Sequence, residues 1–416
     1  MTMKTENDNK NLNVPNLRFP EFSGEWDRIK VSDLLEFYTT NSLSWDQLDY
    51  SDVGIFNLHY GLIHKGLPTQ VDVSENILPT IKEEFVPKKM SLCQNGDIAF
   101  ADASEDTNDV AKCIELSNCE NKKIVCGLHC IHGRDIQNKT VIGYKGYAFS
   151  ALSFRNQIRR LAQGTKIYSI SSGNFSECHI GIPSKTEQNK IGKLLLVVDK
   201  RITTQIKIIE DLKKLKSAIS NSVFSQEPIA WRRLDTLFDK GKAGGTPSST
   251  NKDYYGGDIP FLSINDITRQ GKYICSTENH ISQLGLKNSS AWIVPANSLI
   301  LSMYASVGLA AINTIPIATS QAMFAMQLKD INDIDFLYYY LNYFRYRHIH
   351  KYLETGTQSN INADIVRGIM IPDYGTDRNI EISNALLVID QKIDNESIVL
   401  NNYNSTKQYL LSQMFI

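Results

Sequence analysis

Four residues in the first half of the chain are of the types that hold zinc. Cys119, Cys126, Cys130 and His132 lie close together in the sequence. The spacing between Cys126 and Cys130 is not that of a zinc knuckle. In an extended strand these two cysteines share one face with apolar neighbours. We therefore predict that the thiols are small core residues and that the chain holds no metal ion.

Motifs for phosphoryl transfer, methyl transfer and nuclease chemistry are missing from the sequence. The string GKAGGTP at 241–247 has its lysine at the wrong end for a phosphate-binding loop. There is no Pro-rich tetrapeptide of the NPPF type, which enzymes that act on a flipped adenine require beside an aromatic clamp. Pro372 and Asp373 are followed by Glu381, but the lysine that a metal-dependent nuclease needs after its acid is absent. The pattern favours a chain that is not an enzyme by itself.

A polar, glycine-rich segment in the second half is suited to contact with nucleic acid. It reads GGTPSSTNKDYYGGD at 244–258, where the glycines permit tight turns. Its short donors suit phosphates and base edges, although a structural loop over a sheet edge would look similar. The candidate contact residues are Thr246, Ser248, Thr250, Asn251, Lys252 and Tyr255.

Two basic segments are further candidates for phosphate contacts. The stretch 338–360 is typical of an aromatic, basic helix, whose alternative interpretation is a solvated helix face. It supplies Arg345 and Arg347, together with Gln358 and Ser359 in the turn that follows. The stretch 154–166 corresponds to it in the first half, and its basic residues are Arg155, Arg159, Arg160 and Lys166.

These candidates need elements that position them, and the clearest signal for such elements is a repeat. LLVVDKRI at 195–202 returns as LLVIDQKI at 386–393. A shift of 191 residues aligns 197–225 with 388–416 without a gap. Apolar residues in both copies follow a spacing of three and four, which predicts a helix with one apolar seam.

Two helices with matching seams are expected to pack against each other as an antiparallel coiled coil. The alternative is that each helix buries its seam in the core of its own half. Interruptions of the seam repeat as well, because Gln205 and Lys216 align with Glu396 and Lys407. The predicted interface residues are Val198, Ile202, Ile209, Leu212, Ile219 and Val223 in the first helix and Ile389, Ile393, Leu400, Tyr403, Leu410 and Met414 in the second.

The segments before the two helices also correspond, which makes the repeat unit an entire domain plus its helix. Each segment opens on Trp-x-Arg and closes with Gly-Thr and then Ile-Pro, as at Trp26 and Trp231 and at Pro183 and Pro372. Short β-rich runs between these landmarks predict a mixed sheet with surrounding helices. The fold class is therefore α+β, with two domains in a duplicated, pseudo-two-fold arrangement. The predicted boundaries are a disordered tail at 1–14, a first domain at 15–183, a helix at 184–226, a second domain at 227–372 and a helix at 373–416.

The length of the helices suggests a measuring role. A helix of 29 residues at 197–225 spans about 43 Å. That is somewhat more than one turn of B-DNA, at roughly 34 to 36 Å. If the helices run antiparallel, they would hold two related domains a fixed distance apart.

Composition narrows the class of protein. The 416 residues are 42% hydrophobic and carry a net charge of −1, whereas a lone nucleic-acid binder is usually basic. A DNA-binding role would therefore need help from a partner. The seven cysteines show no disulfide framework, and neither a membrane span nor a leader is evident. We expect a cytoplasmic protein.

At this point the sequence resembles the specificity subunits of type I restriction–modification systems. The matching elements are PNLRFPEFSGEW at 15–26, IPSKTEQNKI at 182–191 with its long helix, and GGTPSSTNKDYYGGDIPFLSINDI at 244–267. One departure is that Glu187-Gln188 becomes Arg378-Asn379 in the second half.

The resemblance implies that each domain is a target-recognition domain that reads one half of a split, asymmetric sequence in double-stranded DNA. Helix length would set the unread gap. Implied partners are two adenine methyltransferase subunits and, optionally, two restriction and translocase subunits. S-adenosylmethionine, ATP and magnesium would be bound by those partners, and this chain would bind no cofactor. Competing interpretations are a stand-alone DNA-modifying enzyme and a structural or adaptor coiled-coil protein.

Overall fold

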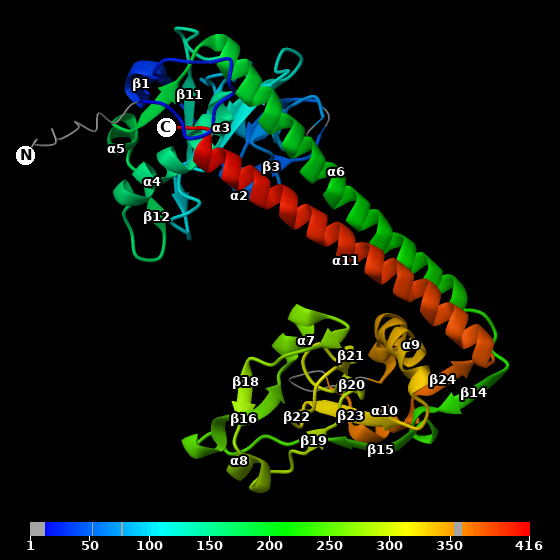
Figure 1. Cartoon of the computed structure of the whole chain (residues 1–416). Helices are drawn as coiled ribbons and strands as arrows, with labels where there is room; N and C mark the ends of the chain where they lie inside the picture. Colours follow the sequence, from blue (N-terminus) through cyan, green and yellow to red (C-terminus); the bar gives the residue numbers. More distant parts are fainter. Residues whose placement is uncertain (1–12, 52, 76–77, 353–359) are drawn as a thin grey trace, which may run out of the picture. The chain divides into compact units, whose positions relative to one another are not determined.

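The computed structural model describes residues 13–51, 53–75, 78–352 and 360–416, and it divides into two compact units (Figure 1). Unit 1 contains the described residues up to Ile206 together with Ile398–Ile416, and unit 2 is Lys207–Ser397. Each unit combines a globular domain with parts of two long helices, α6 (Lys185–Phe224) and α11 (Thr376–Gln413). Within the described ranges, none of the helices combines the length and apolar character that crossing a membrane requires.

Unit 1 contains a five-stranded sheet, a four-stranded sheet and two short two-stranded pairs. The five-stranded order is β2 (Glu36–Tyr38), β11 (Cys130–Arg134), β7 (Ile98–Ala101), β9 (Cys113–Ser117), β5 (Gln70–Asp72). The four-stranded order is β10 (Lys123–Cys126), β4 (Ile55–Leu58), β6 (Thr80–Ile81), β3 (Leu48–Asp49). The pairs are β1 (Asp27–Lys30) with β13 (His179–Ile182) and β8 (Ala103–Ser104) with β12 (Tyr168–Ser169). Its shorter helices are α1 (Val31–Leu34), α2 (Tyr60–His64), α3 (Lys145–Ser150), α4 (Leu152–Leu161) and α5 (Ser172–Ser176).

Unit 2 contains the same kinds of sheet. The five-stranded order is β15 (Phe238–Ala243), β23 (Met323–Leu328), β20 (Leu299–Ser302), β21 (Ala310–Asn313), β17 (Tyr273–Ile274). The four-stranded order is β18 (Asn279–Ile281), β16 (Tyr255–Leu262), β22 (Ile317–Thr319), β19 (Ile293–Val294). A separate pair joins β14 (Ala230–Arg233) to β24 (Met370–Asp373). Its shorter helices are α7 (Ile264–Gln270), α8 (Gln283–Lys287), α9 (Ile334–Arg347) and α10 (Ala363–Gly368).

The two five-stranded sheets share one topology. In each sheet the first four strands pair antiparallel and the last pair, β5 with β9 or β17 with β21, is parallel. The four-stranded sheets likewise share a parallel pair, β4 with β10 and β16 with β22. The structure therefore confirms the predicted α+β class and the duplication of a whole domain.

Alternation along the central strands explains the layers of each unit. Ile98 and Phe100 of β7 join a core with the helices, while Ala99 and Ala101 face the four-stranded sheet, because successive side chains of a strand point to opposite faces. In β20, Leu301 packs on the α9 side and its neighbour Ile300 on the other. Each five-stranded sheet thus lies between helices and a second sheet.

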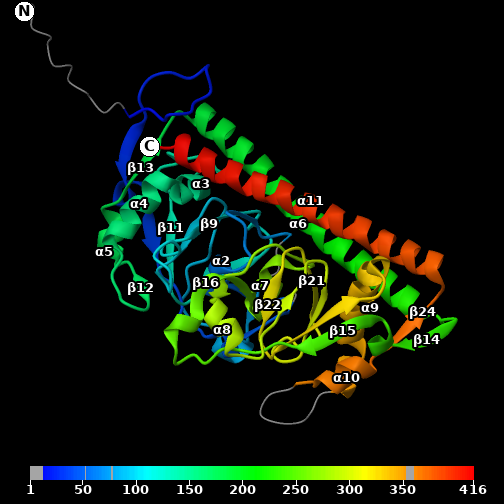
Figure 2. The same cartoon turned by 60° about the horizontal axis from the view of Figure 1, so that its bottom comes forward.

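The long helices complete the cores at both of their ends. Ile191 near the start of α6 shares the main core of unit 1 with Met414 near the end of α11. In unit 2, Phe224 at the end of α6 shares a core with Ile382 near the start of α11. In each unit the start of one helix therefore lies beside the end of the other, and both views show the two side by side (Figure 2). All twelve predicted interface residues are buried or half-buried.

Candidate nucleic-acid interface

One contact attaches the domain of unit 1 to both long helices. The Asp199 carboxylate on α6 accepts a hydrogen bond from the Tyr147 hydroxyl on α3 at 2.8 Å. The other carboxylate oxygen pairs with Lys407 Nζ on α11 at 2.6 Å. Lys407 also lies over the Tyr147 ring. Burial, reinforced by the Asp199 charge, raises the pKa of Tyr147, so its hydroxyl stays a donor.

Unit 2 repeats this contact with the helices exchanged. Asp390 on α11 accepts from the Tyr339 hydroxyl on α9 at 2.9 Å and pairs with Lys216 Nζ on α6 at 2.6 Å. Adding 191 converts Asp199 into Asp390 and Lys216 into Lys407. The lysines that interrupt the apolar seam in the sequence are therefore members of a duplicated Tyr–Asp–Lys contact, which we call the helix anchor.

A second repeated feature lies at the start of each long helix. The buried Gln188 amide accepts from Val141 N and donates to the carbonyls of Lys139 and Pro183. Asn379, also buried, accepts from Tyr374 N. Gln188 and Asn379 occupy equivalent positions in the two halves. Both therefore keep the same role, that of a buried amide bonded to the backbone before its long helix.

The first members of that pair differ in their surroundings. Glu187 is buried and binds the Arg18 guanidinium through both carboxylate oxygens, at 2.7 and 2.8 Å. Its counterpart Arg378 is exposed and pairs with Glu381 within α11. The departure seen in the sequence therefore affects only the residue that ties the segment before β1 to α6.

The candidate phosphate contacts of unit 1 separate into one core residue and three surface residues. Arg155 on α4 is buried, donates to the Asn108 carbonyl, and has its pKa lowered by burial. Most of the Arg155 side chain is covered by the protein, which weakens its assignment as a phosphate ligand. Arg159, Arg160 and Lys166 are exposed.

Two hollows collect basic side chains around α4. The first hollow is lined by Arg160, Arg28 and His179. The second hollow is lined by Arg159 and Lys112. Arg28 and Lys112 were not among the residues predicted from the sequence, because they lie in segments without any local basic pattern.

The predicted glycine-rich loop of unit 2 packs tightly on the sheet. A Cβ on Gly244 would lie 1.9 Å from the Thr319 carbonyl oxygen, so only glycine fits there. Tyr255 is half-buried and donates to the Pro247 carbonyl at 2.6 Å, while Asn251 caps the turn at Asp253 N.

The remaining donors of this loop are on the surface. Thr246, Ser248, Thr250 and Lys252 are exposed, and Ser248 and Thr250 bond to each other. The loop therefore combines the two interpretations that the sequence left open: a structural base and an exposed polar rim.

The aromatic helix is α9, in which Tyr338, Tyr339 and Tyr340 are buried as expected, whereas Tyr346 is exposed. Arg345 donates to the Val307 carbonyl, and Arg347 donates to Asn221 on α6. Both arginines thus have partners within unit 2, which weakens their assignment as phosphate ligands. Gln358 and Ser359 lie outside the described residues.

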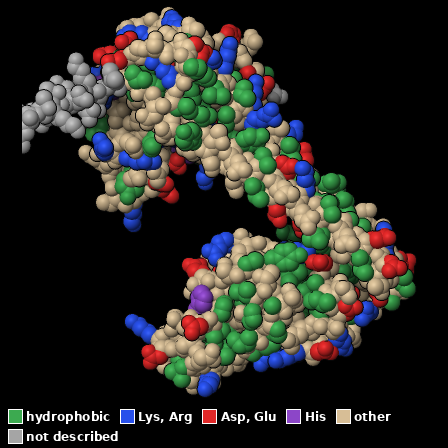
Figure 3. Space-filling model, viewed as in Figure 1, with side chains coloured by type: hydrophobic (Ala, Val, Ile, Leu, Met, Phe, Trp, Pro, Cys, Tyr) green, Lys and Arg blue, Asp and Glu red, His purple; other side chains and the backbone are tan. Residues whose placement is uncertain are grey.

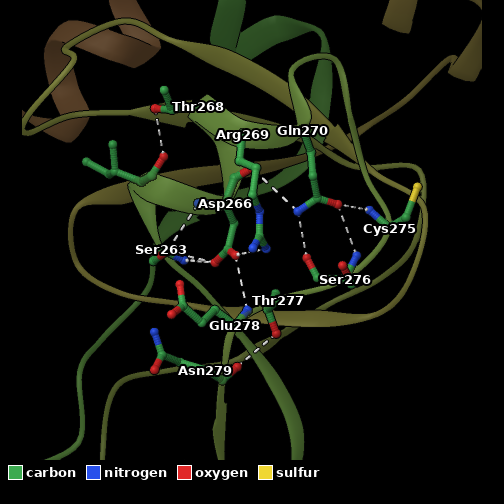
Figure 4. Close-up of polar contacts among 11 residues, drawn as sticks. Ser263, Asp266, Thr268, Arg269, Gln270, Cys275, Ser276, Thr277, Glu278 and Asn279 are labelled. Carbon is green, nitrogen blue, oxygen red and sulfur yellow. Dashed lines mark hydrogen bonds and ion pairs between the residues drawn. The ribbon is translucent and has the colours of Figure 1, made fainter. Parts of the chain in front are cut away.

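A polar cluster on α7 was not predicted from the sequence (Figure 4). The buried Asp266 carboxylate accepts from Ser263 N and Oγ, from Arg269 and from Glu278 N. Gln270 accepts from Cys275 N and Ser276 N in the same turn. The signal available in the sequence was the capping box Ser-x-x-Asp within SINDI.

The α7 cluster leaves Arg269 and Thr268 on the surface. Over the face shown in Figure 3, basic and acidic side chains are interspersed on the described surface. This mixture agrees with the net charge of −1.

A family model identifies the duplicated unit. The model described as "Type I restriction modification DNA specificity domain" matches residues 72–214 and again 227–402, well over half of the chain. The chain belongs to the type I restriction–modification DNA specificity family. The two matches fall largely on the two domains that share one strand order.

Relatives and solved structures agree with this membership. The HindI specificity subunit of Haemophilus influenzae is 34% identical over 113 residues, 27% of this chain and 24% of that protein. The MjaIX specificity subunit of Methanocaldococcus jannaschii is 28% identical over 158 residues, 37% of this chain and 36% of that protein. The matched stretches thus span about a quarter and about a third of these relatives.

The fold resembles that of two solved chains. The S subunit of a type I system from M. genitalium superposes with a TM-score of 0.57 at 15% identity, covering 97% of this chain and 99% of that one. A chain solved in work on complex assembly and conformational transition of the type I R-M system gives a TM-score of 0.60 at 14% identity, covering 93% and 96%. These likenesses concern the fold.

Proposed function

We propose that this chain is the DNA-recognition subunit of a type I restriction–modification enzyme. The observation that carries the proposal is the double match to the specificity domain, once in each unit. In this proposal each domain reads one half of a bipartite target. The sequences of the two domains differ between their shared elements, so in this proposal the two half-sites differ and the target is asymmetric.

Different surfaces would contact DNA in the two units. In unit 1 the hollow lined by Arg28 and Arg160 suits phosphates, since both guanidinium groups are exposed and line the same hollow. In unit 2 the exposed rim of the loop, around Lys252, and Arg269 on α7 supply short donors and a guanidinium. Base reading belongs to side chains that reach a groove, and phosphate contacts set the register of the domain.

The paired helices would set the number of unread base pairs and dock the methyltransferase subunits. Their exposed faces mix both charges, which suits a protein partner better than a polyanion. Two methyltransferase subunits, and optionally two restriction and translocase subunits, would bring S-adenosylmethionine, ATP and magnesium. In this proposal the chain contributes recognition and no bond-breaking step. Such an enzyme would act on chromosomal DNA in the cytoplasm.

Genome-wide mapping of methylated adenines tests the proposal. The chain is co-expressed with the methyltransferase subunit of its own system in a host that lacks adenine methylation. The expected result is one split motif with two unlike halves. A palindromic motif would contradict the proposal that the two units read different half-sites.

Two further experiments address the competing interpretations. Methylation by this chain expressed alone would indicate a stand-alone enzyme. If the assembled complex binds a specific duplex and a random duplex equally well in a competition at controlled salt concentration, the chain would be an adaptor.

A further inference from the structure

Three side chains from three separate segments of unit 1 converge between its two sheets. Cys93 lies before β7, Cys126 ends β10, and His132 lies on β11. The backbone explains the meeting, because an isolated bridge joins Leu92 to Val125 and so sets Cys93 beside Cys126. The two Sγ atoms are 3.7 Å apart. One ring nitrogen of His132 and both sulfurs lie within 4.8 Å of one another.

This cluster differs from the group that the sequence suggested. Cys119 and Cys130 are not among its members, and the Cys130 thiol instead faces the Leu58 carbonyl. Cys93 is a member although it lies far upstream in the sequence. Sequence spacing missed the cluster because the fold, and not a local turn, assembles it.

The histidine in the cluster is oriented by a fixed partner. His132 Nε2 lies 2.7 Å from the Asp97 carboxylate, which also binds the Arg134 guanidinium. With Nε2 donating to Asp97, Nδ1 carries the free lone pair. Among the described residues His132 Nδ1 is buried without a hydrogen-bond partner. An imidazole held by a carboxylate with its other nitrogen free is the usual arrangement of a histidine that binds a metal ion.

The distances and chemistry of the cluster select the kind of ion. Two sulfur ligands at about 2.3 Å from a tetrahedral zinc ion are separated by roughly 3.8 Å, close to the 3.7 Å between the two sulfurs. Thiolates and imidazole suit zinc, whereas calcium and magnesium require oxygen ligands. Binding would release the protons of Cys93 and Cys126. Two thiolates, one neutral imidazole and a divalent cation sum to zero charge, which suits a site where all three residues are buried.

In contrast to the sequence-based prediction of a chain without a metal ion, we propose that Cys93, Cys126 and His132 bind one zinc ion inside unit 1. The ion joins the four-stranded sheet, through Cys126, to the five-stranded sheet, through His132. Three protein ligands leave one tetrahedral position to a small ligand such as water.

The second unit forms the same pair of sheets, and its described residues hold no such group of ligands. His132 pairs with Ala99 of β7, and at the equivalent place on β23 Ala325 pairs with Ile300 of β20. Alanine cannot bind a metal ion. The expected stoichiometry is therefore one zinc ion per chain, and unit 2 serves as an internal reference.

The test uses the full chain, purified without chelator from cells supplied with zinc. Elemental analysis is expected to give about one zinc ion per chain, released on titration with a chelator and a colorimetric indicator. Replacement by cobalt is expected to add the thiolate-to-cobalt charge-transfer absorption that identifies sulfur ligands. Cys93→Ser and Cys126→Ser should each lose the ion and the absorption. Cys113→Ser, which changes a buried thiol outside the cluster, should keep both.

Two results would overturn the proposal. One is native wild-type chain with neither zinc nor the cobalt absorption after reconstitution under reducing conditions. The other is a Cys93→Ser or Cys126→Ser chain that keeps stoichiometric zinc with an unchanged circular dichroism spectrum. If both variants fail to fold, the wild-type cobalt spectrum decides, because only thiolate ligands produce that band. A Cys93–Cys126 disulfide in the freshly isolated protein would also count against it.

Discussion

Asp199 and Asp390 connect each domain to both long helices. Each accepts a hydrogen bond from a tyrosine of the domain and a salt bridge from a lysine of the opposite long helix. These carboxylates are largely shielded from water, so their contacts are worth more than those of surface ion pairs. The helix anchor therefore fixes each domain on the helix pair.

Removing one anchor carboxylate tests that role. Asp199→Ala leaves Lys407 and the Tyr147 hydroxyl without their acceptor, so we expect unit 1 to lose about 1–3 kcal/mol in its free energy of unfolding. Chemical denaturation of the full chain, followed by probes in unit 1, measures the change. Glu177→Ala is the matched control within unit 1, because the Lys30–Glu177 pair is exposed and should contribute little to the free energy of unfolding. Equal shifts for both variants would contradict the proposed role of the helix anchor in fixing the domain of unit 1.

The arginines of α4 make a second prediction at this scale. Arg160→Ala should weaken DNA binding by the assembled complex and reduce the slope of log K against log salt by about 0.9, the value for one phosphate contact. Arg155→Ala should instead lower the stability of unit 1, because Arg155 is buried and bonded to Asn108. Fluorescence anisotropy at several salt concentrations and thermal unfolding separate the two effects. An unchanged salt slope for Arg160→Ala would place the interface elsewhere.

Among the elements, the long helices were the most predictable from sequence. Their seam repeats every three and four residues and recurs after 191 residues, so the helical type followed from periodicity. The periodic window of 29 residues at 197–225 is shorter than α6, which has 40 residues. The anchor did not follow, because the sequence marks Lys216 and Lys407 only as flaws in the seam. The role of Arg155 was also beyond prediction, since a basic residue on a short helix does not reveal which face the protein covers.

The α7 cluster gives a prediction at the scale of one helix turn. Asp266→Ala removes the acceptor of four donors, so α7 and the turn at 275–279 should lose protection from hydrogen exchange, with a cost of about 1–3 kcal/mol. Ser263→Ala removes the cap alone and should cost about 1 kcal/mol. Thr268→Ala, on the exposed face of α7, serves as the control and should leave exchange unchanged. Equal exchange in all three variants would show that the cluster does not order this turn.

Lengthening both long helices tests the proposed measuring role. Duplicating residues 200–206 in α6 and the equivalent 391–397 in α11 adds one heptad to each helix and preserves both seams. Seven residues add roughly 10.5 Å, about three base pairs at 3.4 Å each. Methylome mapping should show the same two half-sites with a gap lengthened by about three base pairs. Duplication in α6 alone misaligns the seams and should abolish methylation, and an unchanged gap in the double variant would contradict the measuring role.

At the scale of the whole molecule, duplication was visible in the sequence but the composition of each unit was not. The repeated landmarks predicted two domains, and the shared sheet topology confirms them. The predicted boundaries set the final helix, at 373–416, apart from the second domain at 227–372. In the structure its end belongs to the core of unit 1, where Phe415 contacts Trp26 and Tyr144. Sequence separation gives no hint of such a contact, because it depends on the direction in which the helix returns.

The packing of the end of α11 into the core of unit 1 has a consequence for biosynthesis. Unit 2 is one continuous stretch, Lys207–Ser397, whereas unit 1 also needs Ile398–Ile416, which the ribosome makes later. Until Leu411, Met414 and Phe415 emerge, the aromatic pocket around Trp26 and Tyr144 has no cover. We expect unit 2 to fold first, and unit 1 to stay accessible to chaperones until residues 398–416 have left the ribosome. Limited proteolysis of stalled nascent chains would show the order, and early protection of the N-terminal lobe would reverse it.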